Sequence, residues 1–430
     1  MRRTVALSLA AMFGAVALLL GLGTGTAQAD GETVFGFLRN GLTPVAGIKI
    51  TVAGPGGFTA SDTTDAKGRW DIKLPKDGTY TVAIDSKALP KGVSLRDKSS
   101  QSRKVVVAFG QNKPVLIPLG KDTRKVEGFW TQAAQLAAEG FRFGLIIALA
   151  AVGLSLIFGT TGLTNFAHGE LVTVGGLLTY WLNTGNLPHF LPNGPKLPFT
   201  VAAALTLVVC ALLGWANDAG LWAPLRRRGT GLIAAMIVSI GLSILVRYIF
   251  LYLFGGSNQS YNAYRGQTGL HIGPLDLAAK DYLSMLVAIV VLMATAYALL
   301  RTRIGKATRA VADNPALAAA SGIDVDRVIK VVWISGAVLA GLSGILLGLA
   351  QGVNFQMGFQ ILLLIFAAVT LGGLGTAFGA LLGSLVVGLF ISLSTLWIPI
   401  ELKNVGALGI LIVILLVRPQ GILGSAQRVG

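Results

Sequence analysis

The chain has 430 residues, of which 53% are hydrophobic and 13% are charged, and its formal net charge is +16. Soluble domains carry about 25% charged residues, so this composition excludes an ordinary soluble protein. The charge is unevenly spread, because residues up to about 125 are rich in charged and turn-forming types, whereas the chain after Phe141 consists largely of apolar runs. The sequence therefore predicts a small soluble module followed by a membrane domain.

The positive charge does not indicate nucleic-acid binding. The basic residues of the second half lie in short loops between apolar runs, which is the positive-inside pattern of membrane proteins. The sequence also disfavours metal chemistry. The single cysteine, Cys210, excludes an internal disulfide and a thiolate cluster, and the three histidines form no HExxH motif.

The N-terminus has the features of a secretory signal peptide. Arg2 and Arg3 precede an apolar stretch over residues 5–22, and the small-residue sequence Ala27-Gln28-Ala29 follows it. This combination predicts a signal peptide over residues 1–29 that is removed on export; the alternative is a first transmembrane helix that is not cleaved. In both cases the module that follows is expected outside a bacterial plasma membrane.

Residues 30–120 show the pattern of a small all-β sandwich. Short β-prone runs are separated by Gly, Pro and Asp at intervals of about ten residues, and the alternation of Ile48, Ile50 and Val52 gives one strand a buried face. The module resembles the carboxypeptidase-regulatory-like, or transthyretin-like, β-sandwich in segments 44–52, 64–70 and 78–82, which implies a fold and not an activity. Strands are expected at residues 33–38, 47–52, 69–74, 79–84 and 104–108.

Residues 121–140 are expected to form an amphipathic linker at the membrane surface. Apolar residues, Trp130 among them, recur there at helical spacing with Lys and Glu between them. The alternative is a linker helix that packs on the β-module.

The region 141–424 predicts an all-α polytopic membrane domain of about nine spans. With an outward N-terminus, nine crossings place the C-terminus in the cytoplasm and the basic loops on the cytoplasmic side. Glycine-rich stretches at 341–348 and 372–383 are expected to let helices pack closely, and 372–375 to form a tight turn. The nine apolar runs occupy residues 141–160, 166–182, 199–222, 232–254, 282–300, 328–350, 360–374, 377–398 and 405–417.

The segment 162–170 interrupts the apolar pattern with an asparagine, a histidine and a glutamate. Ionisable groups at membrane depth cost on the order of 2.5–3.5 kcal/mol each, so they usually face a bundle interior or a water-filled path. Arg247 is another charge inside a predicted span; its side chain either reaches the outer interface or lies along a solute path. Bracing of an interrupted helix is the alternative role for the segment. The candidate solute-path residues are Asn165, His168, Gly169, Glu170 and Arg247.

The loop 301–327 is the best candidate for a cytoplasmic coupling element. The chain has no Walker A sequence, so any ATP must be held by another subunit. Alanines favour a helix in this loop, and Asn314-Pro315 starts a second turn. Such a helix–turn–helix could dock into a soluble ATPase; the alternative is a solvated loop that serves only as a topology signal.

The membrane domain resembles the LivH-type permeases of ATP-binding-cassette importers for branched-chain amino acids. One motif is Gly159-Thr-Thr-Gly-Leu-Thr-Asn-Phe-Ala-His-Gly-Glu170, and the others lie at 305–315, 321–328, 372–380 and 416–423, in family order over roughly 129–424. The resemblance assigns ATPase contact to the cytoplasmic loop. The candidate coupling residues are Gly305, Lys306, Arg309, Asp313, Asn314 and Pro315.

The resemblance also implies partners. They are a second permease, two cytoplasmic ATPases that hold ATP and Mg²⁺, and an external substrate-binding protein; the chain itself is expected to bind no cofactor. The mechanism implied is alternating access, with Asn165 and His168 offering hydrogen bonds to a zwitterion and Glu170 pairing with its ammonium or a helix terminus. The N-terminal module departs from the usual family member, and it could flank, tether or partly replace the binding protein.

Other functions are weighed against this one. A permease for urea or short amides belongs to the same family, whereas a passive channel or ion-coupled transporter would not depend on ATP. A membrane-anchored adhesion protein would need only one span. No nucleophile–base pair or metal arrangement indicates an enzyme, so no catalytic residue is assigned.

Overall fold

The computed structural model describes residues 32–40, 43–90, 93–95, 101–107, 112–120, 128–185, 194–261, 269–399, 409, 412 and 421–423. The chain divides into two compact units, a β unit within Thr24–Val126 and a helical unit from residue 127 on. The expected signal peptide, the first part of the expected linker and nearly all of the last apolar run lie outside the described residues.

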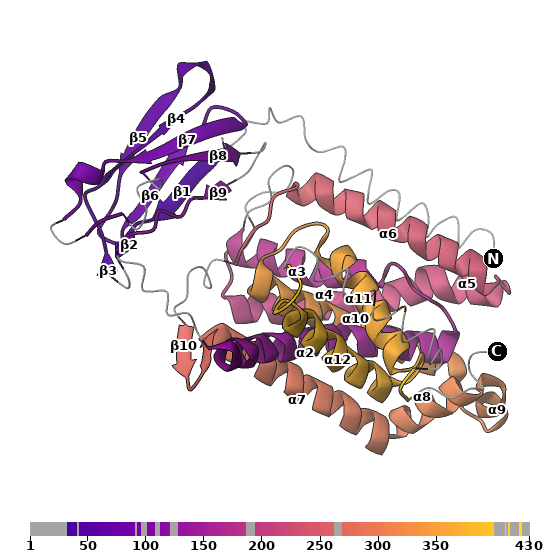
Figure 1. Cartoon of the computed structure of the whole chain (residues 1–430). Coiled ribbons are helices and arrows are strands. Elements are labelled where there is room, and N and C mark those ends of the chain that lie inside the picture. The colour runs from indigo at the N-terminus through magenta and orange to yellow at the C-terminus, as the bar shows by residue number, and fades with distance from the viewer. Residues whose placement is uncertain are drawn as a thin grey trace, which may run out of the picture. The chain divides into compact units, whose positions relative to one another are not determined.

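The β unit has two main sheets whose buried residues form one core (Figure 1). One sheet is antiparallel with the order β5-β4-β7-β8; the other has the order β6-β1-β9, with β1 and β9 parallel. Ile50 and Val52 of β4 point into the core, as do Trp70 and Ile72 of β6, because alternate residues of a strand face the same side. The bounds are β1 (Thr33–Phe37), β2 (Arg39–Asn40), β3 (Thr43–Pro44), β4 (Lys49–Ala53), β5 (Thr59–Thr63), β6 (Arg69–Lys73), β7 (Gly78–Ile84), β8 (Ser102–Val107) and β9 (Asn112–Pro114).

The five expected strands are present, with ends within two residues of the predicted ones. Strand β5 was not predicted because its sequence, Thr-Ala-Ser-Asp-Thr, has no large apolar residue to mark a buried face. Strand β9 was not predicted because it has only three residues and ends in proline.

The helical unit contains most of the described chain. Six of its stretches are long and apolar enough to cross a membrane: α2, the continuous helical stretch Phe199–Arg227, α6, α7, α10 and α12. A π-helical turn, Asp218–Trp222, joins α4 to α5 within that stretch. The bounds are α2 (Phe129–Thr161), α3 (His168–Thr184), α4 (Phe199–Asn217), α5 (Ala223–Arg227), α6 (Leu232–Phe254), α7 (Ala279–Arg301), α8 (Arg303–Asp313), α9 (Pro315–Ala320), α10 (Val325–Gln351), α11 (Met357–Gly372) and α12 (Ala377–Ser394).

The expected count of about nine spans is not confirmed by the described residues. Helices α3 and α11 occur at expected places, but with 17 and 16 residues they are shorter than the other candidates. A helix perpendicular to the bilayer needs about 20 residues to cross the hydrocarbon. Both helices begin after a non-helical segment, and the predicted runs at 166–182 and 360–374 are displaced from them by two or three residues at each end.

The described part of the expected linker does not form a separate helix. Helix α2 is continuous over 33 residues and includes both the end of the linker and the first predicted span. At the linker end, Gln135 bonds to the backbone N–H and carbonyl of Asp276, at 2.9 and 3.0 Å. Asp276 belongs to a hairpin of β10 (Gly269–Ile272) and β11 (Leu275–Ala278) that the sequence analysis did not predict.

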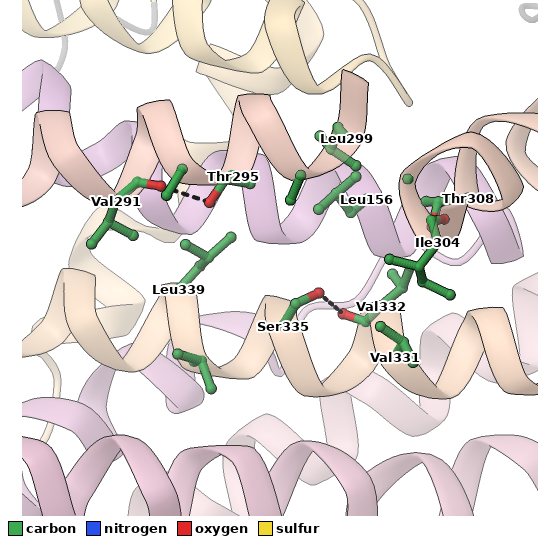
Figure 2. Close-up of a pocket in the computed structure, with 14 residues that line it drawn as sticks. Leu156, Val291, Thr295, Leu299, Ile304, Thr308, Val331, Val332, Ser335 and Leu339 are labelled. Carbon is green, nitrogen blue, oxygen red and sulfur yellow. Dashed lines mark hydrogen bonds between the residues drawn. The ribbon is translucent and has the colours of Figure 1, made fainter. Parts of the chain in front are cut away.

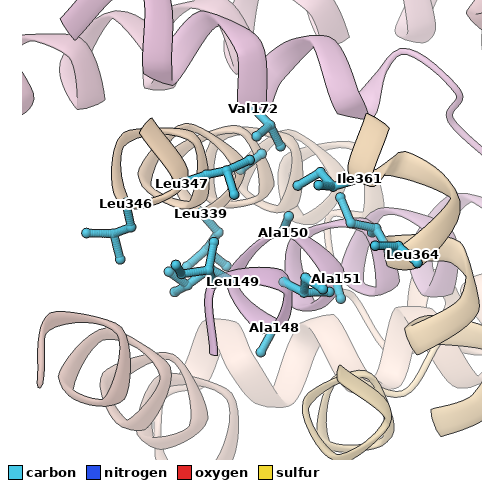
Figure 3. Close-up of a cluster of buried hydrophobic side chains, with 14 of the residues drawn as sticks. Ala148, Leu149, Ala150, Ala151, Val172, Leu339, Leu346, Leu347, Ile361 and Leu364 are labelled. Atoms are coloured by element: carbon cyan, nitrogen blue, oxygen red, sulfur yellow. The ribbon is translucent and has the colours of Figure 1, made fainter. Parts of the chain in front are cut away.

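The core of the helical unit lies between α2, α3, α10 and α11, whose alanine and leucine side chains interlock (Figure 3). Glycines bring these helices together, as expected from the glycine-rich stretches. A Cβ on Gly153 of α2 would lie 2.8 Å from the carbonyl oxygen of Gly336 on α10. A Cβ on Gly344 of α10 would overlap the carbonyl of Val172 on α3. Small residues therefore permit backbone-to-backbone packing at these crossings.

Candidate functional site

The polar segment 162–170 forms a break between two helices. Helix α2 ends at Gly162, whose φ of 69° requires the left-handed region, and α3 begins only at His168. Within the break, the Asn165 Oδ1 accepts a hydrogen bond from the backbone N–H of Ala167 at 3.0 Å. The His168 Nε2 lies 2.9 Å from the carbonyl oxygen of Ala150 on α2. Both polar side chains are fully buried.

Glu170 and Arg247 form an ion pair between α3 and α6. The Glu170 Oε1 accepts hydrogen bonds from the Arg247 Nε at 3.1 Å, the Arg247 Nη2 at 2.8 Å and the Ser243 hydroxyl at 2.9 Å. The guanidinium carbon lies 3.7 Å from the ring centre of Phe359, a cation–π contact. The Arg247 side chain is 15% exposed and that of Glu170 4%.

Glu170 and Arg247 were predicted to lie along the same path, but not as a pair. Glu170 was expected to meet a ligand's ammonium or a helix terminus, and in the structure it pairs with Arg247. A usable signal existed, because the rare charged side chains within membrane-spanning segments tend to pair with one another.

The polar contacts of α6 with this segment lie along one stripe of the helix. Ser239, Ser243 and Arg247 are spaced by four residues and therefore share a face. The hydroxyl of Ser239 accepts a hydrogen bond from the backbone N–H of Phe166 at 3.0 Å. The stripe thus links α6 to the break at Phe166 and to the first turn of α3 at Glu170.

Each of the three polar side chains of the segment uses one polar atom in these contacts and has a second, buried polar atom that takes no part in them. Among the described residues, no hydrogen-bond partner is found for Asn165 Nδ2, His168 Nδ1 or Glu170 Oε2. Gly169 has a different role, since a Cβ there would lie 2.8 Å from the carbonyl oxygen of Gly358 at the start of α11. It brings α3 and α11 close together.

The expected helix–turn–helix is present as α8 and α9. The Thr302 hydroxyl caps α8 by accepting from the N–H of Gly305 at 3.1 Å, and the Asn314 Oδ1 caps α9 by accepting from the N–H of Leu317 at 3.0 Å. Pro315 occupies the first turn of α9, where a missing N–H costs nothing. A small cluster of Val311, Ala318 and Val328 packs the two helices against α10.

The surface of this element carries the other predicted residues. Lys306, Arg309, Asp313 and Asn314 are exposed, and Leu317 is an exposed apolar residue at 65%. Gly305 instead is buried, and a Cβ there would overlap the last turn of α7. Among the predicted coupling residues, Gly305 thus lets α8 pack closely on the end of α7. Lys306, Arg309, Asp313 and Asn314 lie on the surface that a partner protein could contact.

The expected tight turn between α11 and α12 is also present. Gly373 and Gly375 have φ values of 110° and 78°, which favour glycine. The chain near residue 422 returns to this turn, where the N–H groups of Ile422 and Leu423 donate to the carbonyls of Leu371 and Gly372 at 2.7 and 2.9 Å. Two segments that carry the family resemblance are thus in direct contact.

A family model described as "branched-chain amino acid transport system / permease component" matches residues 136–416, which include the helix break and the helix–turn–helix. The chain belongs to this family. It is therefore a multi-pass membrane protein of the permease type, in agreement with its several long apolar helices.

Curated relatives support the same assignment. The chain is 30% identical over 298 residues to the high-affinity branched-chain amino acid transport system permease protein LivH of Escherichia coli K12, a match that covers 67% of this chain and 94% of the relative. It is 29% identical over 300 residues to BraD of Pseudomonas aeruginosa, which covers 68% and 96%. LivM of Escherichia coli K12 matches at 23% over 305 residues, covering 65% and 68%. No solved structure matches.

Proposed function

We propose that this chain is a transmembrane permease subunit of an ATP-binding-cassette importer for branched-chain or related small amino acids. The observation that carries the proposal is the family match over 136–416, together with relatives that are themselves branched-chain amino acid permeases. The match includes both the polar break in the helices and the exposed helix–turn–helix, the two parts that an ATP-driven importer needs.

The polar break is the proposed solute path. Asn165, His168 and Glu170 each retain a buried polar atom without a partner in the described chain, and such atoms can exchange hydrogen bonds with a zwitterion. The ion pair of Glu170 and Arg247 holds α6 against the break. Alternating access would require the two to separate in one state, and the substrate would have to contact the two states differently to bias them.

The helix–turn–helix is the proposed contact with a partner ATPase. Its exposed residues include the cations Lys306 and Arg309 on α8 and the apolar side chain of Leu317 on α9. Two ATPases would bind ATP and Mg²⁺, so that this chain needs no nucleotide site or cofactor of its own. The chain matches both LivH and LivM relatives, which supports pairing of two related permeases.

The proposed topology places the β unit outside the bacterial plasma membrane and the C-terminus in the cytoplasm. About nine crossings, with the exposed cations of α8 on the inner side, satisfy the positive-inside rule. An external binding protein would deliver the substrate on the same side of the membrane as the β unit.

Uptake in proteoliposomes tests the proposal. The chain is reconstituted with its second permease, both ATPases and the binding protein, and the uptake of radiolabelled leucine is compared with that of urea. We expect leucine uptake that needs ATP, with a Leu317→Glu/Asn314→Ala variant reducing it at least tenfold. A Leu270→Glu variant serves as a matched control, because Leu270 is an exposed leucine at 49% in the β10–β11 hairpin.

Other results would redirect the assignment. Uptake of urea without leucine would indicate an amide permease of the same family. Flux through this chain alone, without ATP, would overturn the importer in favour of a channel or a secondary transporter.

A further inference from the structure

The helical unit contains an elongated cavity of about 430 Å³ between α2, α7, α8 and α10 (Figure 2). It follows α7 from Val291 to Leu299 and α10 from Val331 to Leu339. Eight residues of helix correspond to a rise of about 12 Å, so the cavity is long and narrow. This volume lies in the range of small-molecule sites.

The lining of the cavity suits hydrocarbon and not a polar solute. Among the described residues that line it, none is charged and only three carry hydroxyls. Each hydroxyl is already used within its own helix: Thr295 donates to Val291 at 2.8 Å, Thr308 to Ile304 at 2.9 Å and Ser335 to Val332 at 3.1 Å. A polar ligand would lose its hydrogen bonds to water without replacement, which is costly.

The cavity reaches the surface beside the start of α8. Ile304 and Val331, which line this end, are 37% and 36% exposed. The neighbouring cations Arg301, Arg303 and Lys330 are exposed as well. Residues 299–313 contain four basic side chains and a single acidic one, Asp313. The mouth is therefore strongly cationic.

The outer side of α7 indicates that the mouth opens toward lipid. Leu286, Val290, Met293 and Tyr297 recur every three or four residues and are each more than half exposed. In a membrane permease such an apolar face is covered by acyl chains. Ala294, which lines the cavity, is exposed beside Met293, so the cavity continues this face inward.

We propose that the cavity binds one acyl chain of an anionic phospholipid, with the phosphate held by Arg301 and Arg303. The apolar walls accept the chain, and the cationic mouth selects the headgroup. The site is distinct from the polar break between α2 and α3. Because Ile304 and Gly305 belong both to the cavity wall and to α8, the bound chain would contact the element proposed to meet the ATPase. The inference rests on membership in a membrane family and not on the transported substrate.

Photolabelling of the assembled complex tests whether the cavity binds a lipid acyl chain. The complex is placed in vesicles of phosphatidylglycerol that carry a diazirine in the middle of one acyl chain, irradiated, and mapped by mass spectrometry. We expect labels on residues 291–308 and 331–339. Ala298→Phe, which fills the cavity, should reduce labelling there at least fivefold, and Val338→Phe from the opposite wall should repeat the effect. Val290→Phe, on the outer face of α7, is the control and should leave it unchanged.

Headgroup selection is tested with the same probe. Arg301→Gln/Arg303→Gln should lower phosphatidylglycerol labelling of the cavity at least fivefold, whereas Arg227→Gln/Arg228→Gln, which removes exposed cations elsewhere, should not. A phosphatidylcholine probe that labels as strongly as phosphatidylglycerol would overturn the selection of an anionic lipid. Labelling that survives both filling variants, or that occurs in the isolated chain and vanishes in the complex, would overturn the lipid site. None of these readouts needs transport, so the failure of the proposed importer would be seen separately.

Discussion

Helices α2 and α6 are both long and apolar enough to cross a membrane, yet α2 is largely buried inside the protein and α6 is largely exposed. In their most apolar stretches, 78% of the residues of α2 are buried inside the protein, against 17% for α6. Lipid tails are as apolar as leucine, so apolar composition drives insertion but does not choose a helix's neighbours. The contacts that choose them differ between the two helices.

Glycine gives α2 its neighbours. A Cβ on Gly140, Gly153 or Gly159 would come within 2.9 Å of a carbonyl oxygen on another segment, so these backbones are nearly in contact. Helix α6 has a glycine too, Gly241, but no described atom would lie within 4 Å of its Cβ. In place of backbone packing, α6 presents the stripe of Ser239, Ser243 and Arg247 to the helix break. One helix is held by shape and the other in large part by directional polar bonds.

Removal of one partner of the Glu170–Arg247 ion pair is expected to cause the largest loss of stability. Glu170→Ala should destabilise the protein by about 3–5 kcal/mol, because removal of one partner leaves a buried charge uncompensated. Arg247→Ala should behave similarly, and the double variant should be less destabilised than the sum of the two. A double-mutant cycle on thermal unfolding of the purified protein measures this. Strictly additive effects would show that the pair contributes nothing to the attachment of α6.

Glycine substitution should have the next largest effect. Gly153→Ala on α2 would place a Cβ 2.8 Å from the carbonyl oxygen of Gly336 on α10, and overpacking of this kind costs about 1–3 kcal/mol. The matched variant, Gly241→Ala, should be neutral or stabilise α6 by up to about 1 kcal/mol, since alanine is the better helix former. Thermal unfolding should thus shift in opposite directions. Equal losses in both variants would mean that close packing does not distinguish the two helices.

Removal of a single hydroxyl from the stripe, that of Ser243, is expected to cause a smaller loss of stability. Ser243 donates to Glu170 and accepts from the Arg247 Nη2 at 2.8 Å. Ser243→Ala should cost about 0.6 kcal/mol, the average measured for hydrogen bonds between membrane helices. Ser243→Thr, which keeps the hydroxyl, is the control. A loss as large as that of Glu170→Ala would indicate that the serine, and not the ion pair, holds α6.

The smallest effect is expected on the exposed side of α6. Ile237 is 62% exposed, and Ile237→Ala should change the unfolding free energy by less than about 0.5 kcal/mol. The same substitution at Ile147 of α2, which is fully buried, should cost about 2–5 kcal/mol. If Ile237→Ala instead impairs assembly with the second permease, this face of α6 is an interface and not a lipid contact.

Much of the fold could be read from local pattern. Short β-prone runs separated by turn residues located five strands of the β unit, and the apolar run at 232–254 has the same bounds as α6. Asn314-Pro315 marked the start of α9, because an asparagine side chain caps the helix and proline tolerates the first turn. The motif 162–170 was correctly singled out, but the run predicted from residue 166 did not show that the helix begins only at His168.

The sequence by itself determined most of the long helices, five strands of the β unit and which few polar residues stand out among the apolar ones. These properties depend on residues near one another in the chain. Only the tertiary structure decided that Glu170 meets Arg247, 77 residues later, that α2 is central and α6 peripheral, and that an apolar cavity lies between α7 and α10. In a membrane, an apolar helix face is equally well solvated by lipid tails and by another helix. Which helices pack together therefore depends on how the shapes and hydrogen-bonding groups of two surfaces match, and the sequence of a single segment does not contain that information.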